Sequence, residues 1–156
     1  MNLTGAHGFD FLVGEWRVHH RRINPATGEW VEFDGACSGR LLMDGTASVE
    51  EHLLNPPSGT YHAIGLHSYD AKTGTWFNWW LDGRYPTGPL DPPVRGKFVN
   101  GVAATYSEFD KDGKKGIARL TWSDITATSF RFEQASSVDD SKTWETNWIM
   151  EFHRTR

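Results

Sequence analysis

Apolar and polar residues alternate along short segments through almost the whole chain. Period-two alternation is typical of strands with one buried face, and these segments are rich in Val, Thr, Phe, Tyr and Trp. Turn residues separate them, for example Asn24–Glu29, Asp70–Thr75 and the Asn100–Gly101 pair. The pattern predicts strands at 15–23, 29–39, 47–54, 61–69, 75–82, 94–99, 102–109, 116–123, 128–137 and 144–153.

This arrangement of elements predicts an all-β fold. Many even strands joined by tight turns, with no long helical pattern, favour a single closed antiparallel β-barrel of about ten strands, and a β-sandwich is the main alternative. Residues 8–14 are expected to form a short N-terminal helical plug at one end, with Phe9, Leu12 and Val13 facing inward. We find no internal linker, so residues 1–156 are expected to form one lipocalin-like domain.

Composition removes several classes of function. The net charge is -4 and no basic run exceeds two residues, which argues against nucleic acid and anionic membrane as partners. The N-terminal residues do not form a secretory signal, and no stretch is long and apolar enough to span a membrane as a helix. The only cysteine, Cys37, has no internal partner for a disulfide. A reducing, cytoplasmic location is therefore expected.

Eight tryptophans in 156 residues are the strongest functional signal. Each is large and carries an N–H that needs a partner. Several lie on one face of a predicted strand. This favours a wide interior that stacks on a flat ligand, although a solidly packed tryptophan core is the structural alternative.

The chain resembles a known family in several places. The segments FDFLVGEW (9–16), YDAKTGTWFNWWLD (69–82), LDPPVRGKFVNGV (90–102), TWSDIT (121–126) and TWETNWIMEF (143–152) are similar to an uncharacterised bacterial family of lipocalin-like (calycin) domains of unknown function. The resemblance implies a barrel of about ten strands that is cytoplasmic more often than secreted, and it implies no activity. His67 and Phe132 depart from the pattern, which has Arg and Trp there.

Strand parity identifies candidate ligand-binding residues. Parity places Trp16 and His20 on one face of the first strand, and the resemblance favours the face of 75–82 that carries Trp76 and Trp80. Arg84 opens the proline-rich segment 85–93, which is a candidate rim or lid. The expected ligand-binding set is Trp16, Trp76, Asn78, Trp80, Asp82, Arg84, Trp122, Gln134 and Trp148.

Polar residues on apolar faces suggest acid–base chemistry as an alternative. Glu51 lies between Val49 and Leu53, and burial there would raise its pKa. Beside Tyr106 or His20, such a carboxyl could move protons in an isomerisation or cyclisation.

Other chemistries have less support. No metal-binding motif is present, so no metal and no cofactor are expected. Haem remains a minor alternative, with His20 or His153 as its axial ligand. The leading interpretation is a protein that binds a small apolar or aromatic molecule inside the barrel, with a cyclase- or isomerase-type enzyme as the alternative. A homodimer is compatible with the sequence.

Overall fold

The computed structural model describes residues 1–156 and contains ten strands and three short 3-10 turns. The strands are β1 (Gly14–Ile23), β2 (Trp30–Leu42), β3 (Ala47–Leu54), β4 (Tyr61–Asp70), β5 (Thr75–Asp82), β6 (Val94–Val99), β7 (Val102–Lys111), β8 (Lys114–Ser123), β9 (Ser129–Ser137) and β10 (Glu145–Arg154). The 3-10 turns are η1 (Gly5–His7), η2 (Asp10–Leu12) and η3 (Met43–Gly45). No helix has the length and hydropathy needed to cross a membrane.

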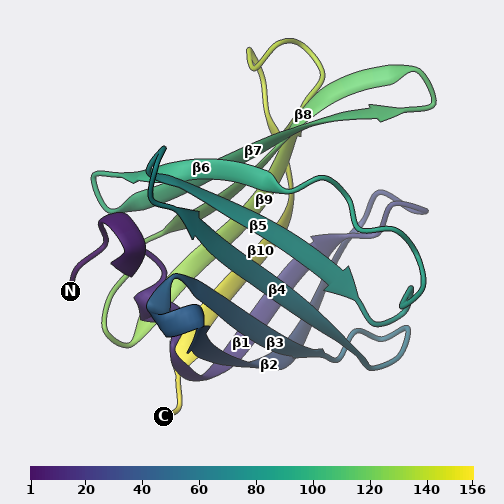
Figure 1. The fold of residues 1–156 in the computed structure, drawn as a ribbon. Helices are drawn as coiled ribbons and strands as arrows, with labels where there is room; N and C mark the ends of the chain where they lie inside the picture. Colours follow the sequence, from purple (N-terminus) through teal and green to yellow (C-terminus); the bar gives the residue numbers. More distant parts are fainter.

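The strands form one closed barrel of lipocalin-like type, as predicted. Each strand pairs antiparallel with its neighbour in the sequence, and β1 closes the sheet by pairing with both β2 and β10 (Figure 1). Closure gives every strand a partner on both sides. The seam between β5 and β6 is short, because only Trp76–Asn78 pair with Val94–Gly96.

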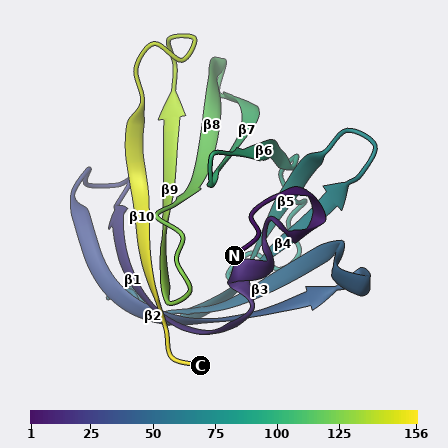
Figure 2. The same ribbon diagram turned by 90° about the vertical axis from the view of Figure 1, so that its left-hand side faces the viewer.

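The N-terminal segment closes one end of the barrel (Figure 2). Phe9 is buried there, with its ring 4.9 Å from Trp76, 5.0 Å from Phe98 and 5.0 Å from Trp122 between centroids. The prediction of an N-terminal plug is therefore confirmed in position, although its turns are 3-10. The predicted inward position of Val13 is wrong, since Val13 is exposed.

Backbone carbonyls of the plug accept hydrogen bonds from two indoles of the barrel. Trp16 donates from Nε1 to the Leu12 carbonyl at 2.9 Å, and Trp76 donates to the Gly5 carbonyl at 3.2 Å. The Arg154 guanidinium lies 4.2 Å from the Trp16 ring and donates to the Val13 and Ala127 carbonyls. The plug is thus held by hydrogen bonds as well as by apolar packing.

Candidate functional site

A cavity of about 430 Å³ occupies the other half of the barrel. Its aromatic walls come from β5, β8, β9 and β10 and consist of Trp80, Trp122, Phe132 and Trp148. Rings of this wall stand nearly perpendicular to one another: Trp80 and Trp148 are 5.8 Å apart with an interplanar angle of 87°, and Phe132 and Trp148 are 6.3 Å apart at 86°. Such rings pack edge to face and together bound the space between them.

The cavity opens beside the short β5–β6 seam. Beyond Asn78, β5 has no partner on the side of β6, and residues from both of its faces, such as Trp79 and Trp80, line the cavity. The proline-rich segment 85–93 passes this opening, and its residues Tyr85 and Leu90 also line the cavity. The segment therefore forms the rim that the sequence led us to expect.

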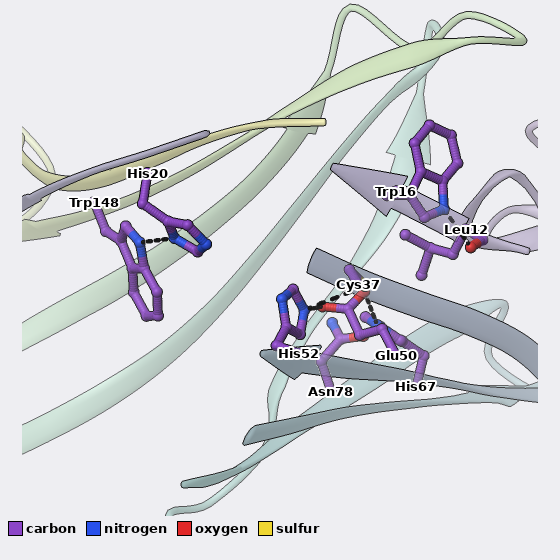
Figure 3. Close-up of polar contacts among 9 residues, drawn as sticks. All are labelled: Leu12, Trp16, His20, Cys37, Glu50, His52, His67, Asn78 and Trp148. Carbon is purple, nitrogen blue, oxygen red and sulfur yellow. Dashed lines mark hydrogen bonds and ion pairs between the residues drawn. The ribbon is translucent and has the colours of Figure 1, made fainter. Parts of the chain in front are cut away.

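A polar cluster lies at the inner side of the cavity (Figure 3). Glu50, on β3, accepts hydrogen bonds from His52 Nε2 to Oε1 at 2.9 Å and from His67 Nε2 to Oε2 at 3.2 Å. The other ring nitrogen of His67 contacts the Asn78 side-chain oxygen. Glu50, His67 and Asn78 line the cavity, whereas His52 is completely buried behind them.

Strand register brings this cluster together. His67 on β4 is directly opposite Asn78 on β5, and Glu50 on β3 is opposite Gly65 on β4. A Cβ atom at Gly65 would lie 2.7 Å from Glu50 Cγ, so only glycine leaves space for the carboxyl to lie across β4. The glycine thus helps to fix the position of the carboxylate.

Glu50 is an ionised carboxylate in this setting. Burial alone raises the pKa of Glu50, but the hydrogen bonds and charges of His52 and His67 outweigh it, and the pKa lies below its ordinary value. An ionised carboxylate can only accept hydrogen bonds, so both histidines donate to it. The cluster therefore presents a charged acceptor at the inner side of an aromatic cavity.

Cys37 adjoins this cluster but does not form a nucleophilic triad. Its Sγ lies 3.7 Å from His52 Nε2, which is the same nitrogen that donates to Glu50. A nucleophile–base–carboxylate relay needs both ring nitrogens of the histidine. Burial also raises the pKa of the Cys37 thiol well above its usual value. The cysteine is therefore a poor nucleophile here.

His20 is buried next to the cavity wall. Its Nδ1 accepts a hydrogen bond from Trp148 Nε1 at 3.1 Å, its ring stacks on Phe33 at 4.6 Å, and its Nε2 has no hydrogen-bond partner. Burial, reinforced by the charges of His52 and Arg22, lowers the pKa of His20 to about 3. His20 therefore fixes the Trp148 indole as a neutral acceptor.

Two of the three predicted acid–base residues face away from the cavity. Glu51 is exposed, because the inner face of β3 carries Glu50 and His52 and the alternate residues point outward. Tyr106 is 42% exposed and packs against Trp144 on the outside. The predicted inward positions of Glu51 and Tyr106 are wrong, and the buried acid–base pair that lines the cavity is Glu50 and His67.

The predicted ligand-binding residues divide into two groups. The cavity is lined by Asn78, Trp80, Asp82, Trp122, Gln134 and Trp148. Trp16 and Trp76 are buried in the closed end of the barrel. Arg84 lies outside the cavity, where it pairs with Asp82 at 2.8 Å and covers the Tyr61 ring at 3.9 Å. Arg22 is the arginine that lines the cavity, with its guanidinium 3.9 Å from the Trp148 ring.

The histidines do not suit an axial role toward haem. His153 is exposed on the outer face of β10, and His20 does not line the cavity. His67 does line it, but both of its ring nitrogens already face oxygen atoms of Glu50 and Asn78. No group of three or more His, Cys, Asp and Glu residues is arranged to hold a metal ion.

Comparison with known proteins supports the fold. No family model matches the chain, and no curated protein sequence is significantly similar to it. The solved structure of an S-type phycobiliprotein lyase from Guillardia theta is similar, with a TM-score of 0.62 over 96% of this chain and 92% of the lyase chain. The two sequences are 10% identical, so the similarity concerns the fold alone.

Proposed function

We propose that the protein binds a small apolar or aromatic molecule in the open half of its barrel. The observation that carries this proposal is the cavity of about 430 Å³ between Trp80, Trp122 and Trp148. Its volume and its lining, in which aromatic and aliphatic side chains are mixed with polar groups, suit a small-molecule site. Asn78, Gln134 and Glu50 are the groups we propose to orient the ligand.

Equilibrium dialysis with 1-methylnaphthalene, a flat neutral probe, tests this function. Trp80→Leu and Trp148→Leu each remove one aromatic wall and should weaken binding by about 1–2 kcal/mol, because aromatic contacts contribute beyond the area that they bury. Trp30→Leu is the matched control, since Trp30 is 48% exposed at the start of β2 and should leave binding unchanged. Equal losses in all three variants, or no binding by the natural protein, would refute the proposal.

The second candidate is an enzyme of the isomerase or cyclase type that uses Glu50 and His67. The favouring observation is that the carboxylate and the imidazole lie 3.2 Å apart and both line the cavity. A group that holds a proton next to an ionised acceptor is suited to general acid–base catalysis. The phycobiliprotein lyase is by its name an enzyme, which supports retaining this alternative. In an enzyme, Glu50→Gln would abolish turnover and leave substrate binding largely intact.

We also propose that the chain belongs to the uncharacterised bacterial lipocalin-like family that its motifs resemble. The support is that the motif residues of 9–16 and 69–82 form the plug, β1 and β5 of a ten-stranded barrel. The solitary, buried Cys37 agrees with a cytoplasmic location. A homodimer remains compatible with this proposal.

A further inference from the structure

We propose that the ligand is a cation: a flat aromatic molecule with a positively charged nitrogen that enters the cavity with this nitrogen directed toward Glu50. This inference rests on the proposed binding function and adds the charge of the ligand to it. It is carried by two features of the same cavity, the ionised carboxylate at its inner side and the perpendicular aromatic rings around it.

The first feature is the buried carboxylate of Glu50. Glu50 is 6% exposed, and both of its hydrogen-bond donors within the protein are imidazole nitrogens. Glu50 is the only carboxylate of the cluster, and it is buried in a site of low dielectric, where an opposite charge is attracted more strongly than in water.

The second feature is the aromatic wall of the cavity. The faces of indole and phenyl rings carry partial negative charge and attract cations, and Trp is the strongest of these side chains. Trp80 and Trp148 stand perpendicular, and Trp122 lies 5.2 Å from Phe132 at an angle of 65°. Rings at such angles can surround a cation from several sides, which is how aromatic cages bind quaternary ammonium groups.

Arg22, at the mouth, is the only lysine or arginine that lines the cavity. Arg22 lies near the end of β1, where its guanidinium covers Trp148 and donates to the Tyr61 hydroxyl at 3.2 Å. Asp82, at the end of β5, is already paired with Arg84. Asp91 of the proline-rich segment also lines the cavity, so the mouth has two arginines and two aspartates, whereas the inner side has Glu50 as its one carboxylate. This difference in charge between the mouth and the inner side orients a cationic ligand with its charge toward Glu50.

Two probes of the same shape separate the contribution of charge from that of shape. In 1-methylquinolinium a cationic nitrogen takes the place of the methyl-bearing ring carbon of 1-methylnaphthalene. We expect the natural protein to bind 1-methylquinolinium at least about tenfold more tightly at pH 8, where free imidazole is neutral. Equal or weaker binding of the cation overturns the inference while leaving the proposed function intact. Failure of both probes to bind refutes the proposed function itself.

A variant pair assigns the preference to one carboxylate. Glu50→Gln should reduce the affinity for 1-methylquinolinium about tenfold and change that for 1-methylnaphthalene less than twofold. Glu51→Gln is the matched control, because it makes the same change of charge on the exposed face of the same strand. Equal losses in the two variants would overturn the assignment. If Glu50→Gln does not fold, the ratio of the two probe affinities in the natural protein still decides the question.

Discussion

The two ends of the barrel use the same residue types for opposite purposes. At the closed end, Phe9 fills the space between Trp76, Phe98 and Trp122, and Trp16 packs against Phe130 at 4.8 Å. At the open end no plug enters, and Trp80, Trp122 and Trp148 surround a cavity. Tryptophan content therefore does not distinguish a solid core from a binding site. The decisive element is the short segment before β1, which fills one end and leaves the other free.

The largest expected effect comes from removing the ring that fills the closed end. Phe9→Ala should lower the free energy of unfolding by about 3–5 kcal/mol, because it leaves a cavity among fully packed rings. Trp80→Leu, which changes a wall of an existing cavity, should cost only about 1–2 kcal/mol. Urea denaturation followed by circular dichroism measures both values. Equal losses would mean that the open end is packed as densely as the closed end.

The next effect is a loss of folding stability at low pH, which arises from His20 beside the cavity wall. Because the pKa of His20 is lowered to about 3 in the folded protein, the unfolded chain takes up a proton first as the pH falls below about 6.5. Stability is therefore unaffected by His20 above this pH and is lost on acidification. The loss should reach about 2–3 kcal/mol at pH ~4.5.

His20→Gln tests this origin of the acid sensitivity. Glutamine keeps an acceptor for the Trp148 indole but does not titrate. Denaturation between pH 7 and pH 4.5 should therefore show a shallower loss of stability in the variant. Glu50 adds its own loss only at lower pH, since its folded-state pKa is lowered from an ordinary value of 4.5. Identical slopes in the two proteins would contradict the burial of a neutral His20.

The smallest effect is expected at the mouth. Arg84 is bonded to Asp82 and covers Tyr61, so it holds the start of the proline-rich segment and does not line the cavity. Arg84→Ala should cost at most about 1 kcal/mol, as is usual for exposed ion pairs. Acidic and neutral aromatic probes should be affected equally. Selective loss of acidic probes would place Arg84 in the binding site after all.

The sequence predicts the fold well because the barrel depends on turns and alternation. All ten strands form close to their expected positions, and the inward face is correct on β1, where alternation marks it. It is also correct on β5, where both faces are aromatic and only the family resemblance favoured the face of Trp76 and Trp80. The inner set Trp76, Asn78, Trp80 and Asp82 lies as expected, with Asn78, Trp80 and Asp82 lining the cavity.

The alternation of apolar and polar residues did not predict the polar side of the site. On β3 the outer residues Val49 and Leu53 are more apolar than the inner residues Ser48 and Glu50, so hydrophobicity selects the wrong face. The Glu50 carboxylate tolerates burial because His52 and His67 donate to it. His67 and its partner on β3 are 17 positions apart. One signal in the sequence was that His67 and Phe132 depart from the pattern of the family that the chain resembles, and both residues line the cavity.

A crystal structure of the protein soaked with 1-methylnaphthalene would show whether the open end of the barrel binds an aromatic molecule. We expect electron density for the probe between Trp80, Trp122 and Trp148, and no probe at the closed end around Phe9. A structure in which these three indoles pack against one another, leaving no space for a ring, would contradict the existence of the cavity and the function proposed for it.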